Sequence, residues 1–228
     1  MKTTTLLRTC AAAALAVASL AAQAADLGSN LIVNGDAESG VSGWTVYAGT
    51  DLFQSVSYGS NWVLPTQPGP VNRGAKMFAG ASSAFSAGFQ AIDVSSLTAS
   101  FAAGTTSFDL NGYLGGWTSQ GDNAQLLVTF IDAASADISM VTLGPVTPAD
   151  RGNQTGLLYR QVTGFVPAGT SSIKFDLTME RLNSSDNDGY ADNLAFVLNT
   201  AAVPEPQTYG LMALGLGFLA LALRRSKA

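Results

Sequence analysis

The stretch SFDLN, residues 107–111, alternates polar and apolar side chains without a break. The stretch IKFDLT, residues 173–178, shows the same period of two. Such a period is typical of an antiparallel strand that has one face on a core and the other toward solvent. These two stretches therefore predict an all-β fold.

Similar short segments, rich in β-branched and aromatic residues, recur between residues 25 and 200, separated by Gly, Asn, Asp, Ser and Pro. A long helical period is absent there, and residues 80–84 and 147–151 form single turns at most. Many short strands with frequent turn signals predict an antiparallel two-sheet β-sandwich or jelly roll. The expected strands are Leu31–Val33, Trp44–Tyr47, Phe53–Tyr58, Ala75–Phe78, Phe89–Val94, Ser107–Leu114, Gln125–Ile131, Ile138–Leu143, Leu157–Phe165, Ser172–Thr178 and Ala191–Leu198.

Residues 25–200 have the usual size of one domain. They hold all acidic residues except Glu205, which makes 15, and six of the basic ones, so their net charge is −9. Because this charge repels phosphate backbones, nucleic acid is a poor candidate partner. The chain has no histidine and one cysteine, Cys10, which excludes a disulfide framework and sites built on His or several Cys.

The first 24 residues have the features of a secretory signal peptide. Lys2 and Arg8 give a positive start, residues 11–20 are mostly apolar, and Ala22-Gln23-Ala24 is a small-x-small cleavage site. We predict cleavage after Ala24, which would also remove Cys10.

A second apolar segment lies at the other end of the sequence. Residues 206–225 would span roughly 30 Å as an α-helix, about the thickness of a bilayer core. Arg224, Arg225 and Lys227 follow the apolar run and predict a cytoplasmic stop. Residues 201–205 are then a linker, and residues 206–228 form a transmembrane helix with a basic tail.

The motif Val203-Pro204-Glu205-Pro206 stands just before this helix. Proline fixes φ and removes a hydrogen-bond donor, so the motif is a stiff, extended peptide that a processing enzyme can hold. Residues 203–228 as a whole resemble the PEP-CTERM sorting signal of Gram-negative bacteria that make exopolysaccharide. An incidental Pro-Glu-Pro before a plain single-span anchor is the alternative.

The resemblance implies an exosortase-type enzyme as partner, removal of the helix near the motif, and release or attachment at the cell surface or in the extracellular matrix. The precursor would be held in the inner membrane. The same tail is also called an ice-binding protein C-terminal domain. The core contains no Thr-x-Thr ladder, so ice binding is not expected.

Two segments of the core carry a further resemblance. The segment NLIVNGDAESG, residues 30–40, followed by Gly43-Trp44, resembles the opening strand of galactose-binding-like jelly rolls, which include carbohydrate-binding modules. The segment NDGYADNL, residues 187–194, resembles their closing strand. In that family the first and last strands run close together and often hold a structural calcium.

The resemblance implies carboxylate ligands to calcium from Asp36, Glu38 and Asp192. Calcium takes six to eight oxygen ligands and needs neither His nor Cys. The alternative is that these residues only form Asx turns at strand ends.

Aromatic side chains offer platforms for a sugar ring, if polar neighbours select its hydroxyl groups. Trp62 and Trp117 lie beside Gly, Ser and Asn and are the surface candidates, together with Tyr113. Trp44 is expected in the core. Packing of all these residues in the core is the alternative to ligand binding.

The core contains little that indicates catalysis. It has only two Glu, Glu38 and Glu180, and neither a phosphate-binding loop nor a nucleophile elbow. We therefore predict an exported protein that is not an enzyme and that binds polysaccharide, associated with exopolysaccharide or biofilm. A structural or adhesive matrix protein without specific sugar binding is the alternative.

Overall fold

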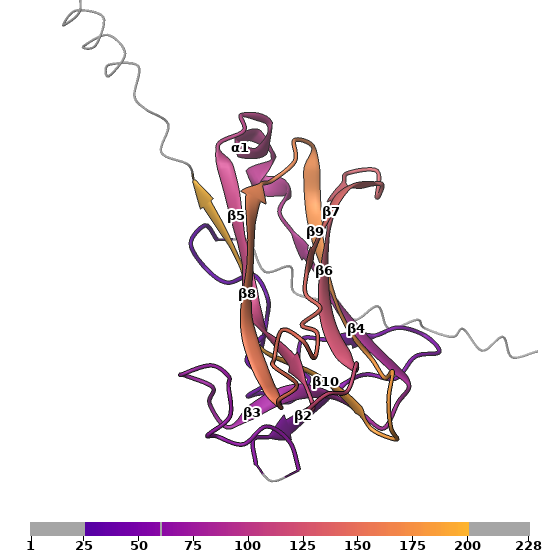
Figure 1. Cartoon of the computed structure of the whole chain (residues 1–228). Coiled ribbons are helices and arrows are strands. Elements are labelled where there is room, and N and C mark those ends of the chain that lie inside the picture. Colours follow the sequence, from indigo (N-terminus) through magenta and orange to yellow (C-terminus); the bar gives the residue numbers. More distant parts are fainter. Residues whose placement is uncertain (1–25, 60, 201–228) are drawn as a thin grey trace, which may run out of the picture.

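Two antiparallel sheets, packed face to face, make up the computed structural model, which describes residues 26–59 and 61–200 (Figure 1). The first sheet has the strand order β1-β4-β9-β6-β7 and the second β2-β3-β10-β5-β8. The expected two-sheet sandwich is thus confirmed. The strands are β1 (Thr45–Val46), β2 (Gln54–Ser57), β3 (Lys76–Ala81), β4 (Phe85–Asp93), β5 (Thr106–Gly116), β6 (Asn123–Asp132), β7 (Asp137–Leu143), β8 (Gly156–Phe165), β9 (Thr170–Glu180) and β10 (Asn187–Thr200).

Helical structure in the described ranges is limited to a 3-10 turn, Ser95–Leu97, and the short helix α1 (Thr98–Ala102). The sequence did not predict α1. None of the helices in residues 26–59 and 61–200 is long and apolar enough to cross a membrane. The predicted signal peptide, residues 1–24, and the predicted transmembrane segment, residues 206–228, lie outside the described residues.

The predicted first strand, Leu31–Val33, is wrong. This segment is irregular, because Asn34 and Ala37 just beyond it adopt positive φ angles of 51° and 60°, which interrupt an extended chain. Asn30 fixes the segment instead: its Oδ1 accepts the backbone N–H of Phe196 at 2.9 Å, and its Nδ2 donates to the Leu194 carbonyl at 3.0 Å. The first segment therefore lies against β10, held by these side-chain bonds together with a few isolated backbone bonds, among them that from the Leu31 N–H to the Phe196 carbonyl at 2.9 Å.

The main core fills the space between the sheets. Phe196 of β10 is stacked on Phe108 of β5, with ring centroids 5.3 Å apart, and meets Phe175 of β9 edge-on at 5.2 Å. Trp44 is buried, as expected, and packs edge-on against Phe53. The alternation seen in SFDLN and IKFDLT thus points the apolar residues of β5 and β9 into one core.

A smaller apolar cluster lies apart from the main core. It contains Val63, Met77, Ala79, Leu157 and Tyr190, from strands β3, β8 and β10 of the second sheet and from the β2–β3 connection. Partly buried aromatic residues pack against it, and three of them are the predicted ligand residues Trp62, Tyr113 and Trp117. The three predicted ligand residues therefore lie together on the outer side of this sheet.

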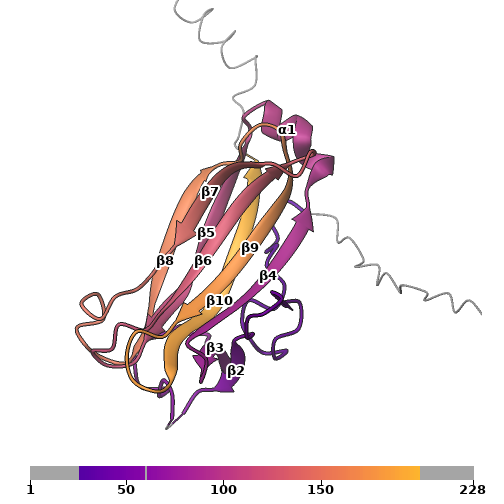
Figure 2. The ribbon, with the colours of Figure 1, turned by 90° about the vertical axis from the view of Figure 1, so that its right-hand side faces the viewer.

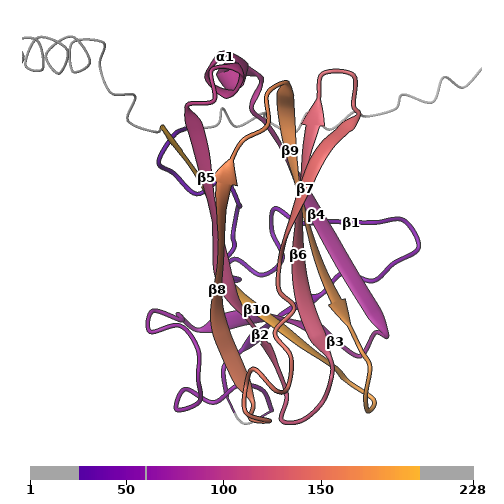
Figure 3. The same ribbon diagram turned by 45° about the horizontal axis from the view of Figure 1, so that its top comes forward.

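The two ends of the sandwich differ in what they carry (Figures 2 and 3). One end, which we call the α1 end, holds α1 and the last residue of β10, Thr200. The opposite end, the loop end, holds the β2–β3, β5–β6 and β9–β10 connections. Strand β10 runs from the loop end to the α1 end, a distance of roughly 40 Å for a strand of its length.

Gln90 of β4 fastens the irregular first segment to the first sheet. Its side chain is 4% exposed. Its Nε2 donates to the Val33 carbonyl at 2.8 Å, and its Oε1 accepts the Val33 N–H at 2.9 Å. One side chain thus satisfies both backbone groups of a residue that has no strand partner.

We expect Gln90→Ala to lower the free energy of unfolding by about 1–3 kcal/mol, because it leaves both groups of Val33 without a partner. Urea unfolding followed by tryptophan fluorescence measures the loss. The control is Gln154→Ala, at an exposed position of the β7–β8 connection, with an expected change within about 0.5 kcal/mol. Equal losses in the two variants would show that Gln90 does not anchor the segment.

Candidate functional site

A cleft of about 620 Å³ opens at the loop end of the second sheet. Trp62 and Trp117 both line it, so two of the three predicted ligand residues come together; we call it the tryptophan cleft. Tyr113 is not among its lining residues, and instead meets Tyr159 edge-on at 5.4 Å, on the same apolar cluster. The other lining residues are Gln54, Asn61, Ala81, Ser82, Asp186 and Asp188.

Trp62 is held by a tight turn. Its N–H donates to the Gly59 carbonyl at 3.0 Å, and the Gly59 N–H donates to the Val63 carbonyl at 3.1 Å. Val63 is fully buried, and the indole of Trp62 packs edge-on against the buried ring of Tyr190, with centroids 6.0 Å apart. The indole of Trp62 is thus fixed by its contact with Tyr190, and it remains partly exposed at the cleft.

Arg151 holds the connection that follows Trp117. The Arg151 side chain is only 7% exposed, and it donates to the carbonyls of Thr118 at 2.8 Å and Gln120 at 3.1 Å, and also to that of Gln154. Burial lowers the pKa of Arg151 from its usual value. A charged guanidinium bound to several carbonyls fixes this loop, and with it the position of Trp117.

Asp188 and Asp186 bring carboxylates to the cleft. Asp188 is 8% exposed and accepts a hydrogen bond from the Tyr190 hydroxyl at 2.6 Å. Burial raises the pKa of Asp188, and the negative charges of Asp122 and Asp186 act in the same direction. Asp186 is exposed in the β9–β10 connection.

Asp122 binds the backbone of the segment that carries both of these carboxylates. It is fully buried, and its Oδ1 accepts the backbone N–H groups of Leu182 and Asn183, each at 2.7 Å. Its Oδ2 accepts the N–H of Asp188 at 3.1 Å. Sequence reasoning missed the roles of Asp122, Asp186 and Asp188, since their only signal was a cluster of Asp and Asn near strand ends.

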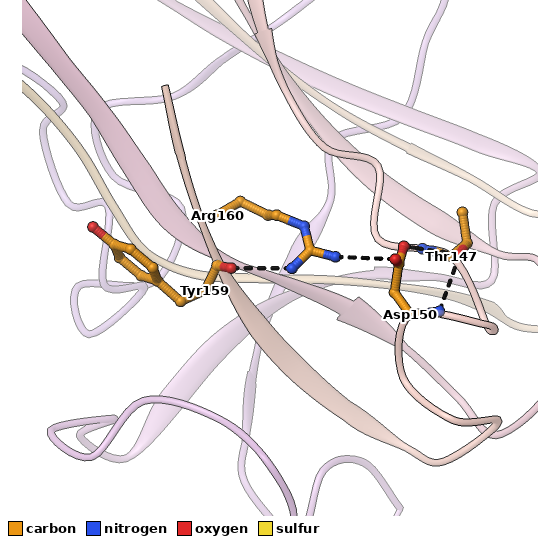
Figure 4. A network of polar contacts seen from close by, with 4 residues as sticks. All are labelled: Thr147, Asp150, Tyr159 and Arg160. Atoms are coloured by element: carbon orange, nitrogen blue, oxygen red, sulfur yellow. Dashed lines mark hydrogen bonds and ion pairs between the residues drawn. The ribbon is translucent and has the colours of Figure 1, made fainter. Parts of the chain in front are cut away.

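Several cations of the domain are bound elsewhere. Among the described residues that line the cleft, none is a lysine or an arginine. Lys174 pairs with Asp176 at 3.2 Å on the first sheet. Arg160 pairs with Asp150 at 3.4 Å, and Asp150 also accepts the N–H and hydroxyl of Thr147 (Figure 4). The backbone hydrogen bond from Thr147 is the main reason why the pKa of Asp150 is lowered.

The predicted calcium ligands Asp36, Glu38 and Asp192 lie near one another, but Glu38 and Asp192 accept hydrogen bonds from different segments of the chain. Asp192 is fully buried and accepts the Tyr58 hydroxyl at 2.5 Å and the Asn193 N–H at 2.7 Å. Burial raises its pKa to about 7, and the charges of Asp36 and Glu38 add to this shift. Glu38 accepts the N–H groups of residues 75 and 76 at 2.7 and 2.9 Å.

Asp36 is exposed and lines a separate hollow of about 340 Å³ with Asn30, Asn34 and Asn193. In the part of the chain that the structure describes, no three His, Cys, Asp or Glu side chains form a group that could hold a metal ion. Calcium binding would therefore need amide and backbone oxygens around this hollow as well, and it stays a prediction.

Residues 202–226 match the protein family described as the PEP-CTERM protein-sorting motif. The resemblance expected for residues 203–228 is thereby confirmed, and the chain carries the sorting motif of an exported protein. No curated protein matches the sequence.

Solved structures share the sandwich. "Family 16 Carbohydrate Binding Module-2" is 22% identical and has a TM-score of 0.49; the alignment covers 74% of this chain and 99% of that one. The enzymatically active domain of tailspike protein 4 of bacteriophage CBA120 is 16% identical with a TM-score of 0.50, covering 74% of this chain and 21% of that one. TmCBM61, solved with β-1,4-galactotriose, is 14% identical with a TM-score of 0.46, covering 75% and 99%. At 16% identity and a TM-score of 0.50, the likeness to the tailspike domain shows the fold alone.

Proposed function

We propose that the chain is an exported protein whose tryptophan cleft binds a glycan without cleaving it. The observation that carries the proposal is the pairing of Trp62 and Trp117, both partly exposed, in one cleft with carboxylate and amide side chains. Apolar faces of sugar rings pack on aromatic side chains, while polar neighbours bind the hydroxyl groups. The indoles supply the first kind of contact, and Asn61, Gln54 and Asp186 supply the second.

The fixed supports of the two indoles strengthen this proposal. Trp62 rests on Tyr190, and the loop that follows Trp117 is bound by Arg151. A site that is ordered before its ligand arrives loses less conformational entropy on binding. The buried side chains of Arg151 and Asp122 therefore have a role, which is to hold the loops that line the cleft in place.

Binding explains the cleft carboxylates better than hydrolysis does. A glycosidase needs two carboxyl groups that flank the scissile bond and can reach it. Asp188 is nearly buried and bound to the Tyr190 hydroxyl, and Asp122 beneath it is occupied by three backbone N–H groups. We therefore propose that the domain is not an enzyme.

The proposed route of the chain follows from its terminal sequences. Residues 1–24 would export it, residues 206–225 would hold the precursor in the inner membrane, and an exosortase-type enzyme would act near Val203-Pro204-Glu205-Pro206. Arg224, Arg225 and Lys227 would stay on the cytoplasmic side. The match of residues 202–226 to the sorting motif supports this route, and the product would work at the cell surface or in an exopolysaccharide matrix.

The position of the cleft suits a chain held by its C-terminal end. Strand β10 ends at the α1 end of the sandwich (Figure 1). The residues that line the cleft lie in or beside the connections of the loop end. A domain attached beyond Thr200 would therefore present the cleft away from its attachment point. A structural or adhesive matrix protein without specific sugar binding is the alternative, and it assigns no role to the cleft.

A glycan array tests the binding function on the purified full chain in a polyoxyethylene detergent, which contains no sugar. We expect specific retention, weakened about tenfold or more by Trp62→Ala and by Trp117→Ala because each removes an aromatic platform. Phe165→Ala is the control, since Phe165 is exposed at the α1 end of the same sheet. Silence across neutral, basic and acidic glycans would favour the structural alternative.

For the sorting function, we expect Glu205→Ala to leave an unprocessed, membrane-bound precursor in a host that has an exosortase, because the enzyme no longer recognises the motif. Immunoblots of membrane and released fractions measure the product. Glu180→Ala, at an exposed position of β9, should be processed normally. Normal processing of the Glu205 variant would refute the role of the motif.

We also propose that calcium binds beside Asp36, Glu38 and Asp192. Carboxylate, amide and carbonyl oxygens are the ligands that calcium prefers. The buried Asp192 carboxylate beside two other carboxylates, and the hollow lined by Asp36 and three asparagines, support the proposal. A bound cation would relieve the repulsion among the three acidic groups.

We expect millimolar calcium to raise the melting temperature by several degrees relative to chelator, as for a ligand well above its dissociation constant. Asp36→Asn should remove most of this shift without unfolding the protein, because Asp36 is exposed. Asp26→Asn, also exposed, is the charge-matched control. If calcium leaves the melting temperature unchanged, or if the Asp36 variant keeps the whole shift, the site is absent.

A further inference from the structure

We propose that the tryptophan cleft selects glycans that carry primary amines, such as de-N-acetylated hexosamines, over neutral sugars and uronic acids. This inference rests on the glycan-binding function proposed above and names the class of ligand. It is carried by the combination of two indoles and two carboxylates in one cleft, with no positive charge among its described lining residues.

The two carboxylates of the cleft differ in their exposure to solvent. Asp188 is nearly buried, and its carboxylate is held by the Tyr190 hydroxyl at 2.6 Å. Asp186 stands exposed two residues earlier, in the β9–β10 connection. An ammonium group in the cleft would form charge-assisted hydrogen bonds with Asp186 and lie near the Asp188 carboxylate, whereas a sugar carboxylate would be repelled by Asp186.

The indole rings, like the carboxylates, favour a positively charged ligand. The face of a tryptophan ring is negative and attracts a cation placed over it, most strongly where water is partly excluded. Trp62 and Trp117 are both partly buried at the cleft. A protonated amino sugar is therefore attracted by the carboxylates and by the indole faces, while a neutral sugar forms only apolar contacts with the indoles.

Two nearby arginines bind backbone carbonyls, and in the described residues neither forms an ion pair with Asp186 or Asp188. The guanidinium of Arg151 is buried and bound to the carbonyls of the loop that follows Trp117. Arg181 lies at the margin, where it donates to the carbonyls of Ser82 and Ser185. The net charge of −9 over residues 25–200 adds a long-range attraction for a polycation and a repulsion for a polyanion.

The test compares three probes that share a length of five sugars: a glucosamine pentamer, its fully N-acetylated counterpart and a galacturonate pentamer. Binding to the full chain in polyoxyethylene detergent is measured by calorimetry in a mildly acidic buffer of low ionic strength. We expect the glucosamine pentamer to bind roughly tenfold more tightly than the acetylated one and the galacturonate pentamer to bind most weakly. The advantage of the amine should shrink as salt is added.

Variants separate this inference from the binding function. Asp186→Asn should remove most of the preference for the amine while keeping the binding of the acetylated pentamer. Asp137→Asn makes the same change of charge at an exposed position of β7, at the α1 end, and should keep the preference. Trp62→Ala should weaken both hexosamine pentamers.

Four outcomes would overturn the inference. Equal binding of the two hexosamine pentamers, with both lost in Trp62→Ala, would refute the selection of amines and leave glycan binding intact. A preference that survives Asp186→Asn, or that is lost equally in Asp137→Asn, would show that the carboxylate of the cleft does not select the ligand. Binding of none of the probes, together with silence across the glycan array, would remove the binding function itself.

Discussion

The pairing of β10 with β3 and β5 is the interaction on which the rest of the structure depends. Strand β10 (Asn187–Thr200) lies in the middle of the second sheet, and its residues take part in the core, in the tryptophan cleft and in the acidic cluster of Asp36, Glu38 and Asp192. Phe196 enters the core, Tyr190 supports Trp62, and Asp188 reaches the cleft. In a chain without disulfides, the position of this strand must be set by burial and by its two hydrogen-bonded neighbours.

A bulge in β10 changes which of its residues face the core and which face the outer side of the sheet. The pairing with β5 shifts between Asp192 and Ala195, and Asn193 has a φ of +49°. Before the bulge, the even-numbered residues Tyr190 and Asp192 lie on the outer side of the sheet, whereas after it the even-numbered Phe196 packs into the core. One extra residue reverses the alternation, because successive side chains of a strand point to opposite faces.

Local patterns predicted those parts of the fold that depend on neighbours in sequence. The alternation in SFDLN and IKFDLT fixed β5 and β9, and the polar surroundings of Trp62 and Trp117 indicated partial exposure. The failed strand Leu31–Val33 depends on Gln90, 57 residues from Val33, so no local pattern could show that the segment is held by a side chain. Asp122 and Asp188 are 66 residues apart, and the support of the cleft could likewise not be predicted.

Two buried aspartates show why long-range partners decide what a carboxylate does. Asp122 and Asp192 are both fully buried, but Asp122 accepts three backbone N–H groups, whereas Asp192 accepts one N–H and the Tyr58 hydroxyl. Backbone N–H groups stabilise a buried negative charge, so Asp122 is suited to bracing a loop. Burial raises the pKa of Asp192 to about 7, and the nearby carboxylates of Asp36 and Glu38 add to this shift. Because the residue type is the same, the distinction lies in which segments the fold brings together: the β9–β10 connection around Asp122, and the acidic first segment beside Asp192.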